Sequence, residues 1–269
     1  MKITIGLFGF GKTGSVVANE IIKDSDCELK WVVRETSLHE GTYASRFLGY
    51  DHDEGKIYSL GKMDLDQFYK YNKVDVIIDF SASCAVNEYK NAAKYGTRIV
   101  SAISKYGEME FEQLKNLSRL TSVLYSPNIT LGVNFLIEAS KLLQGIAPHA
   151  DIEIIEEHFR DKKGVSGTAL RIAEDLGLDK EKHINSIRVG GIIGKHEVIF
   201  GLPNQTIRII HESLNRAAFG QGAIFAAKWI MTQEKGMFDM EQALSLFMAK
   251  RDENSKRNES FSKNLAADA

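Results

Sequence analysis

The stretch ITIGLFGFGKTGSVVANEII (residues 3–22) decides the fold of the first half of the chain. It opens with a short apolar run, passes through a glycine turn and continues with apolar residues at approximately helical spacing. Gly9, Gly11 and Gly14 form the pattern G-x-G-x-x-G between the strand-like and helix-like parts. In such a unit the first glycine permits a tight turn, the second lets a pyrophosphate approach the backbone, and the third lets the helix pack closely on the strand.

This turn predicts a dinucleotide-binding site, because the N-terminus of the helix presents unpaired N–H groups to the phosphates. The residues expected to contact the cofactor here are Gly9, Phe10, Gly11, Lys12, Thr13 and Gly14. A glycine turn that binds no ligand is the alternative that the pattern leaves open.

The next predicted strand ends in VVRE, which bears on the choice of cofactor. An acid at this place binds the ribose hydroxyls of NAD, whereas an arginine accommodates the 2′-phosphate of NADP. Arg34 therefore favours NADP, and Glu35 keeps NAD open. A later strand, VDVIIDF (74–80), leads into Phe80 and Ser81. We expect these two near the cofactor, because ligands of open α/β sheets gather at the carboxyl ends of strands, although an ordinary polar loop is equally compatible.

Strands and helices alternate through the rest of the first half. Predicted strands lie at 28–35, 74–80, 98–104 and 122–127, with helices around 85–95 and 110–120. This rhythm predicts a mostly parallel, doubly wound sheet. The stretch 36–66 is polar and punctuated by glycines, and its secondary structure is the least readable in the first half of the chain.

The rhythm changes after Gly132. The predicted elements are a helix at 133–145, an alternating strand at 151–158, a helix at about 168–176, strands at 184–191 and 195–213, and helices at 220–232 and 240–249. We expect the later strands to be antiparallel neighbours, with LPNQ (202–205) as a turn.

The chain is therefore expected to be an α/β protein of two domains. Residues 1–130 form a Rossmann-type dinucleotide-binding domain, and residues 131–234 form an α+β domain with an open mixed or antiparallel sheet. A C-terminal helix at about 235–250 is expected to pack back on the first domain, and residues 251–269 are polar and predict a flexible tail.

Composition narrows the class of protein. The 34 Lys and Arg nearly balance the 36 Asp and Glu, so no general attraction to nucleic acid or to a membrane surface is expected. Two isolated cysteines suit a reducing cytoplasm, and no secretion signal or apolar run of roughly 20 residues is present. These features predict a soluble cytoplasmic protein. No group of His, Cys and carboxylate residues has the spacing of metal ligands, so no metal is predicted.

The segment EEHFRDKKGVSGTAL (156–170) concentrates the residue types that carry chemistry. His158 emerges at the end of an alternating strand, and Arg160, Lys162 and Lys163 raise the positive potential beside it. Such a cluster suits an anionic substrate, with a lysine or a histidine as proton donor.

The turn Ser166-Gly167-Thr168 follows, where the next helix begins. Small hydroxyl residues and glycine at a helix N-terminus bind a carboxylate through backbone N–H groups. The whole segment therefore predicts a site for a molecule that bears carboxylates, and a solvated basic loop is the alternative. Elsewhere, His196 lies within a strand pattern and favours a structural or interfacial role, and Trp31 and Trp229 are expected in the core.

The order of these features resembles the dihydrodipicolinate reductase family. The similarity extends from about residue 3 to 248. It rests on the glycine turn, IIDFS, SPNITLGVN (126–134), DIEIIEEHFRDK (151–162), SGTAL (166–170), SIRVGGIIGKHEVIF (186–200) and FGQGAIFAAKWI…GMFDM. The signature of that family is a strand ending in E-x-H-H, a lysine a few residues later, and then D-A-P-S-G-T.

The resemblance implies hydride transfer from NADPH or NADH to a small cyclic, unsaturated dicarboxylate. The reaction it points to first is the reduction of dihydrodipicolinate to tetrahydrodipicolinate on the diaminopimelate route to lysine. It also implies a fold that closes over its site and a homotetramer paired through the C-terminal sheets. On this basis residues 131–234 are expected to bind substrate and to form the oligomer.

Residue by residue, the resemblance assigns proton transfer to His158 and Lys162 and the substrate carboxylate to Ser166, Gly167 and Thr168. Lys163 is the alternative for the motif lysine and is otherwise expected to bind substrate. Besides the glycine turn, the positions assigned to the cofactor are Arg34, Phe80, Ser81, Ala102, Ser104, Ser126 and Asn128.

The chain departs from the family pattern at three places. Phe159 replaces the second histidine, the loop K-K-G-V (162–165) lacks D-A-P and is one residue shorter, and A-I-S-K (102–105) stands where the family has G-T-T-G. Two alternatives follow from these changes. The same fold could reduce a different cyclic imine or enamine in a specialised pathway, or the chain could be a non-catalytic paralogue that binds the cofactor.

Overall fold

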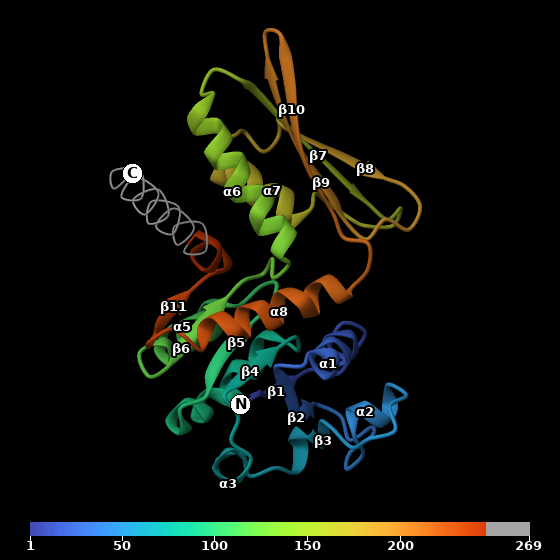
Figure 1. The fold of residues 1–269 in the computed structure, drawn as a ribbon, viewed down its shortest axis with the longest axis vertical. Coiled ribbons are helices and arrows are strands. Elements are labelled where there is room, and N and C mark those ends of the chain that lie inside the picture. Colours follow the sequence, from blue (N-terminus) through green and yellow to red (C-terminus); the bar gives the residue numbers. More distant parts are fainter. Residues whose placement is uncertain (246–269) are drawn as a thin grey trace, which may run out of the picture.

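The computed structural model describes residues 1–245, with strands gathered in two sheets (Figure 1). The larger sheet contains β1 (Ile3–Phe8), β2 (Cys27–Arg34), β3 (Lys56–Ser59), β4 (Val76–Asp79), β5 (Arg98–Ser101), β6 (Ser122–Tyr125) and β11 (Gly236–Phe238). Their order is β11-β6-β5-β4-β1-β2-β3, and every neighbouring pair is parallel. The predicted Rossmann-type sheet is confirmed, and its order reverses between β1 and β4, where ligands of such sheets bind.

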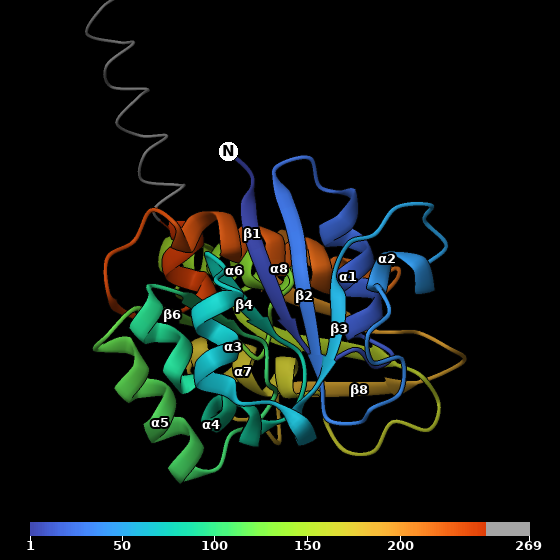
Figure 2. The same cartoon turned by 90° about the horizontal axis from the view of Figure 1, so that it is seen from below.

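Helices cover both faces of this sheet (Figure 2). One face carries α1 (Gly14–Lys23) and α8 (Ala217–Ile230), and the other carries α3 (Leu65–Tyr71), α4 (Val86–Tyr89) and α5 (Glu108–Ser118). Because both faces are covered, every residue of β4 is buried, as the continuous apolar run in its sequence requires. Trp31 and Trp229 are 2% and 7% exposed, which confirms the prediction that both lie in the core.

Parts of the larger sheet were not predicted or differ from the prediction. The stretch 36–66 contains α2 (Ala44–Phe47), the edge strand β3 and a 3-10 helix η1 (Leu60–Lys62). The helix expected around 85–95 is broken into η2 (Ser83–Ala85), α4 and η3 (Lys90–Tyr95), and the chain turns out of it at Gly96, whose φ is +83°.

The end of the described chain agrees with the prediction in part. A helix starts at Met240, where the helix 240–249 is expected, and is described as far as Ser245, whereas residues 236–238, expected in a helix from about 235, form β11 beside β6. Met240 and Ala243 are buried in the core that α1 and α8 share. The predicted end of that helix and the predicted tail 251–269 lie outside the described residues.

The smaller sheet consists of β7 (Asp151–His158), β8 (Ile184–Arg188), β9 (Lys195–Leu202) and β10 (Gln205–Glu212) in the order β10-β9-β7-β8. The expectation that β8 and β9 are antiparallel neighbours is wrong: β7 lies between them, and β8 runs parallel to β7. The chain leaves β7 and returns through a helix, α7 (Gly167–Asp175), and such a crossover joins parallel strands. The hairpin between β9 and β10 turns within 202–205, as predicted.

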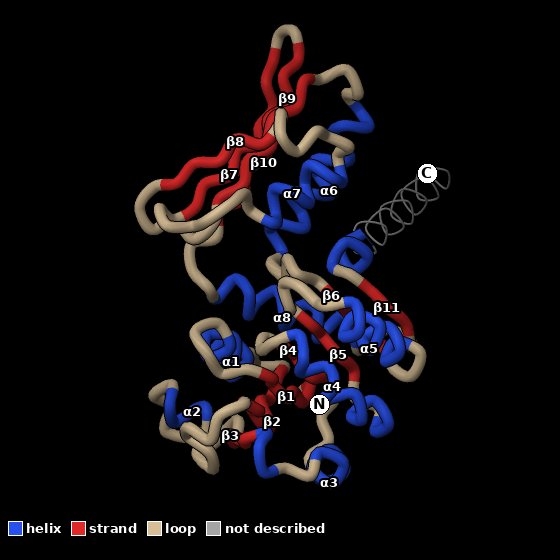
Figure 3. Tube along the Cα trace, turned by 180° about the vertical axis from the view of Figure 1, so that it is seen from behind, coloured by secondary structure: helices blue, strands red, loops and turns tan. Residues whose placement is uncertain are grey.

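The two faces of the smaller sheet differ. Helices α6 (Leu131–Ile146) and α7 cover one face, and no helix within residues 1–245 covers the other (Figure 3). Helix α8 follows this sheet in sequence, within the range 131–234, but it packs on the larger sheet (Figure 1). The sequence therefore passes from the larger sheet to the smaller one and back. Ser126 and Asn128 of the first passage, and Phe219 in the first turn of α8, line the cavity described next.

Candidate active site

A cavity of about 820 Å³ lies between the two sheets. Eight of the residues predicted to bind ligands line it: Ser104, Ser126, Asn128, His158, Lys162, Ser166, Gly167 and Thr168. The first three follow β5 and β6 of the larger sheet, and the other five belong to β7, its following loop and the start of α7. Fold thus brings together residues that are as far as 64 positions apart in the chain, counted from Ser104 to Thr168.

The remaining predicted residues do not line this cavity. Those predicted for the cofactor lie at the carboxyl edge of the larger sheet: Arg34 is the last residue of β2, and the glycine turn (9–14), Phe80 with Ser81, and Ala102 follow β1, β4 and β5. Lys163 is exposed and is also absent from the wall of the cavity, whereas Lys162 is half-buried there.

The glycine turn has the geometry that its pattern predicts. A Cβ on Gly14 would stand 2.1 Å from the carbonyl oxygen of Gly9, so the start of α1 packs tightly on the end of β1. Gly9 has φ +94° and lies against the backbone of Phe80, while a Cβ on Gly11 would meet nothing within 4 Å. The turn is therefore packed on its inner side and open at Gly11, which fits a pyrophosphate bound at the N-terminus of α1.

Arg34 ends β2 and is held by the loop that follows it. Its Nη1 donates to the carbonyl oxygen of Leu38 at 3.0 Å. Its Nε is buried and has no hydrogen-bond partner among the described residues. The guanidinium retains donors for a further acceptor at the place where the ribose of a dinucleotide is bound in this fold.

Asp79 connects the loops after β4 and β5. Its fully buried carboxylate accepts hydrogen bonds from the N–H and hydroxyl of Ser81, at 2.9 and 2.5 Å, and from Tyr89 at 3.0 Å. Tyr106 lies 3.3 Å from the Tyr89 hydroxyl and 2.7 Å from the Ser101 hydroxyl. Burial raises the pKa of Asp79 to about 6, although the hydrogen bonds from Ser81 and Tyr89 oppose that rise. Sequence reasoning placed a ligand site here but did not identify this network.

His158, at the end of β7, is oriented by a carboxylate. Its Nδ1 lies 2.5 Å from Oε2 of Glu156, which is completely buried. Because Glu156 occupies Nδ1, Nε2 is the nitrogen left to exchange a proton with a ligand in the cavity. Burial lowers the pKa of His158, and the positive charges of Lys162 and Arg188 act in the same direction, while Glu156 opposes them.

Glu156 itself is held ionised by four partners. Arg188 donates to both of its oxygens, at 2.5 and 2.9 Å, and the Ser186 hydroxyl donates at 2.6 Å. The backbone N–H of Ser166 donates to it at 3.2 Å. Burial would raise the pKa of Glu156, but the hydrogen bonds from Arg188, Ser186, His158 and Ser166 outweigh it and lower the pKa to about 2.

Ser166, Gly167 and Thr168 lie together at the start of α7, on the wall of the cavity. The Thr168 hydroxyl donates to Oδ1 of Asn128 at 2.9 Å, so the loop after β6 is attached to the start of this helix. The carbonyl of Asn128 accepts from the Ser126 hydroxyl at 2.9 Å and from Asn134 at 2.5 Å. Asn128 was predicted to contact the cofactor, and its recorded contacts join the two sides of the cavity.

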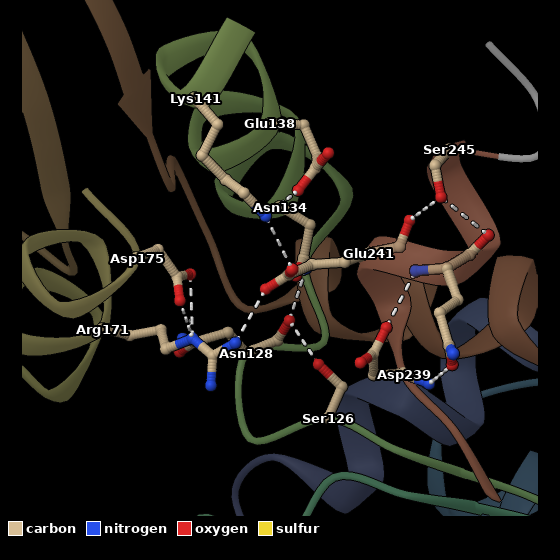
Figure 4. Close-up of polar contacts among 11 residues, drawn as sticks. Ser126, Asn128, Asn134, Glu138, Lys141, Arg171, Asp175, Asp239, Glu241 and Ser245 are labelled. Carbon is tan, nitrogen blue, oxygen red and sulfur yellow. Dashed lines mark hydrogen bonds and ion pairs between the residues drawn. The ribbon is translucent and has the colours of Figure 1, made fainter. Parts of the chain in front are cut away.

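The sequence did not indicate a group of charged residues centred on Arg171 and Glu241 of the cavity wall (Figure 4). Glu241, just after β11, accepts from Arg171 of α7 at 3.0 Å and from Lys141 of α6 at 3.1 Å. Arg171 also pairs with Asp175 at 2.9 Å, and Lys141 pairs with Glu138 at 2.9 Å. The one signal in the sequence is helical spacing, which places Arg171 on the same side of α7 as Thr168. No pattern in the sequence pairs it with Glu241.

The part of the chain that the structure describes contains no group of three or more His, Cys, Asp and Glu residues arranged to hold a metal ion. None of its helices is both long enough and apolar enough to cross a membrane.

Comparisons with known proteins agree along the whole described chain. The family model of the dihydrodipicolinate reductase N-terminus matches residues 3–129, and that of the C-terminus matches residues 129–244. A 4-hydroxy-tetrahydrodipicolinate reductase of Rickettsia bellii (strain OSU 85-389) is 30% identical over 260 residues, which cover 89% of this chain and 94% of the relative. One of Caldanaerobacter subterraneus subsp. tengcongensis is 36% identical over 195 residues, covering 63% and 76%.

A solved structure shows the same fold. The dipicolinate-bound dihydrodipicolinate reductase from Paenisporosarcina sp. TG-14 superimposes with a TM-score of 0.74 at 21% sequence identity. The match covers 89% of this chain and 98% of that one. Both sheets described above are therefore part of one shared architecture.

Proposed function

The chain belongs to the dihydrodipicolinate reductase family, and we propose that its cavity reduces the substrate for which its relatives are named. The protein is an NAD(P)H-dependent oxidoreductase that converts 4-hydroxy-tetrahydrodipicolinate, the hydrated form of dihydrodipicolinate, to tetrahydrodipicolinate and water on the diaminopimelate route to lysine. The substrate is a small cyclic dicarboxylate, so its recognition requires anion-binding groups next to a proton donor.

One observation carries this proposal: the two predicted halves of the site share a single cavity. His158, Lys162 and the Ser166–Thr168 turn line it from the smaller sheet, and Ser126 and Asn128 line it from the larger sheet. A nicotinamide bound along the carboxyl edge of the larger sheet would supply hydride to a ring held at the start of α7.

The residues of the chain then bind the substrate and transfer the proton. The N–H groups at the start of α7 bind one carboxylate and so orient the ring. Lys162 and His158 flank the same cavity, and either can deliver a proton to the ring atom that gains the electron pair when the other atom of the double bond accepts the hydride. Glu156 keeps the proton of His158 on Nδ1 in the neutral ring, so that a second proton enters and leaves through Nε2.

The test is oxidation of NADPH and NADH by the purified protein with freshly generated substrate. Substitution of Lys162 by Ala is expected to lower kcat by about 10²–10⁴-fold, the usual contribution of a positioned general acid. Lys163→Ala is the matched control, since Lys163 is exposed and outside the cavity. Full activity of Lys162→Ala together with loss in Lys163→Ala would reverse this assignment.

The same assay separates the alternatives. Cofactor binding without turnover would indicate a non-catalytic paralogue. Turnover only with another cyclic imine or enamine would indicate a different pathway, and Phe159, which is 44% exposed where the family has a histidine, is the first residue to examine in that case.

For the cofactor we propose NADPH in preference to NADH. Arg34 ends β2, and among the described residues its guanidinium makes one hydrogen bond, from Nη1 to Leu38, which leaves Nη2 to bind a 2′-phosphate. Arg34→Ala is expected to raise the KM for NADPH by about tenfold and to leave that for NADH within about twofold, the loss of one charge-assisted contact. Equal effects on both cofactors would contradict the preference.

We further propose a homotetramer paired through the uncovered face of the smaller sheet. Ile187, Val189 and Ile210 are 42%, 45% and 53% exposed, and Ile187 and Ile210 belong to strands of that sheet. Size-exclusion chromatography with light scattering is expected to give four chains, and Ile210→Lys to give a smaller species. A monomeric wild type would refute this assembly.

We propose the cytoplasm as the location of the protein. Both cysteines are free, which suits a reducing compartment.

A further inference from the structure

We propose that His196 is a positioning residue of the substrate site. It holds the Ser166 hydroxyl away from the N-terminus of helix α7, so that the N–H groups of the first turn remain free for a substrate carboxylate. The inference rests on the proposed function, because it takes the carboxylate ligand from that reaction. It assigns a role to a residue whose sequence context favoured a structural or interfacial one.

Ser166 occupies the position that normally caps a helix. A serine there usually accepts hydrogen bonds from N–H groups of the first turn. Ser166 has the extended backbone of a cap, with φ −61° and ψ +132°, yet its side chain makes no capping hydrogen bond. Its hydroxyl instead lies 2.9 Å from Nε2 of His196, and the two residues are only 3% and 4% exposed.

The register of the smaller sheet places His196 beneath the start of α7. On β9, His196 stands opposite Glu156 of β7 and His211 of β10. The row two residues further along is apolar, with Val198 opposite Ile154. The hydrophobic core under the helices therefore gives way to polar residues at the edge of the sheet that faces the cavity.

The backbone N–H and the side-chain hydroxyl of Ser166 both make their hydrogen bonds with residues of the smaller sheet. Its backbone N–H donates to Glu156, and its hydroxyl meets His196. The other hydroxyl in the turn, that of Thr168, donates to Asn128. Neither side chain competes for the N–H groups of the first turn of α7. In an α-helix the first N–H groups have no hydrogen-bond partner inside the helix. The first turn of α7 is left available for an anion.

The protonation of His196 adds a further donor. Burial lowers its pKa to about 3, so the ring is neutral near pH 7. Its Nδ1 is buried and has no partner among residues 1–245. A proton on Nδ1 would leave an unpaired buried N–H, so we assign the proton to Nε2, which donates it to Ser166. The Ser166 hydroxyl then keeps its own proton to donate into the cavity that it lines.

His196 does not line the cavity itself and acts through Ser166. The expected readout is therefore ligand binding rather than the chemical step. In the test, pyridine-2,6-dicarboxylate (dipicolinate) is titrated calorimetrically into the full chain saturated with NADPH, for wild type, His196→Leu, His196→Gln, Ser166→Ala and the double variant His196→Leu/Ser166→Ala. His149→Gln is the matched control, since His149 is exposed and far from the turn in sequence.

His196→Leu is expected to raise the Kd about tenfold, because the freed Ser166 hydroxyl can cap the helix and occupy an N–H group. His196→Gln offers an amide N–H in place of Nε2 and is expected to remain within about threefold of wild type. In the Ser166→Ala background the leucine substitution should have no further effect, because no hydroxyl remains to be held. In steady state, His196→Leu should raise the KM for substrate and leave kcat within about twofold.

Wild-type affinity in His196→Leu would overturn the proposal, and so would an equal loss of affinity with and without the Ser166 hydroxyl. Failure of His196→Gln to restore binding would also count against it, provided that both variants unfold at the wild-type temperature. Binding requires no turnover. A protein that binds dipicolinate in this pattern but does not oxidise NADPH with substrate would refute the proposed function and leave the role of His196 intact.

Discussion

Arg171 and Glu241 lie 70 residues apart in the sequence, and an ion pair of 3.0 Å between Nη2 and Oε1 joins them. Arg171 belongs to α7, which begins at the Ser166–Thr168 turn, and Glu241 follows the strand that completes the larger sheet. Lys141 of α6 pairs with the same carboxylate (Figure 4). Glu241 therefore links the two parts of the protein at the wall of the cavity.

Loss of this carboxylate is expected to weaken the link measurably. Glu241→Gln should lower the free energy of unfolding by about 1 kcal/mol, since each partly exposed ion pair contributes about 0.2–1 kcal/mol. A double-mutant cycle with Arg171→Gln, measured by urea unfolding, should give a coupling that shrinks in high salt. Glu112→Gln is the control, because its pair with Lys115 is exposed on both sides. Additivity at low salt would show that the pair contributes nothing.

The two glycines of the turn are expected to respond differently to alanine. Gly14→Ala would push a methyl group against the Gly9 carbonyl and should cost about 1–3 kcal/mol of stability, as overpacking does. Gly11→Ala meets open space and should leave stability within about 0.5 kcal/mol of wild type. It should nevertheless weaken NADPH binding by about tenfold, because phosphate approaches the backbone there. Thermal unfolding and NADPH fluorescence titration measure both effects, and tight binding by Gly11→Ala would place the pyrophosphate elsewhere.

Asp79 is expected to destabilise the fold near neutral pH. Its pKa is raised from 3.8 to about 6, so the folded state binds the proton more tightly than the unfolded chain does. The contribution of protonated Asp79 to the free energy of unfolding is fully present below pH 3.8 and is lost as the pH rises through 6. Asp79→Asn should therefore stabilise the protein by about 3 kcal/mol at pH 8, given about 1.4 kcal/mol per pKa unit, and by much less at pH 4. Urea unfolding at the two values tests this; an equal gain at both would point to a cause other than ionisation.

Acid is expected to destabilise the protein in two steps. The pKa of His196 is lowered from 6.5 to about 3, so the unfolded chain takes up a proton that the folded one does not, and stability is lost as the pH falls below 6.5. The pKa of Glu156 is lowered from 4.5 to about 2, so its contribution is present above pH 4.5 and is lost as the pH falls toward 2.

The variant His196→Gln should remove part of the first step and retain the second. Unfolding free energies measured from pH 7.5 to 3.5 should therefore fall less steeply for the variant between pH 6.5 and 4.5. His158 and His211, whose pKa values are also lowered by burial, keep the slope from vanishing. Parallel curves for the variant and the wild type would show that His196 is already protonated in the folded state.

The sequence was informative where local chemistry decides structure. The glycine turn, the apolar strands buried on both faces and the alternating pattern of β7 each follow from one stretch of residues. The Ser166-Gly167-Thr168 turn was located for the same reason, since hydroxyl residues and glycine mark helix starts.

Features that depend on contacts between distant segments were not predicted. Strand β11 has three residues, and it forms only because the edge of β6 is available. The order β7-β8 depends on the crossover through α7, since alternation does not distinguish parallel from antiparallel pairing. The contacts of Glu156 with Arg188 and of Arg171 with Glu241 join residues 32 and 70 positions apart, and no local pattern contains both partners.

The hydrogen bond from the Ser166 N–H to Glu156 has a consequence for how this protein can evolve. It fixes the two ends of the loop 159–165, because Glu156 lies on β7 and Ser166 opens α7. A loop whose ends are fixed can gain or lose residues cheaply, since even a doubling of its length changes the closure entropy by only about 0.6 kcal/mol. Apart from Lys162, which lines the cavity, the segment can therefore drift in length and composition while Ser166, Gly167 and Thr168 keep their places. This makes it the natural part of the chain to exchange when a different ring is to be accommodated.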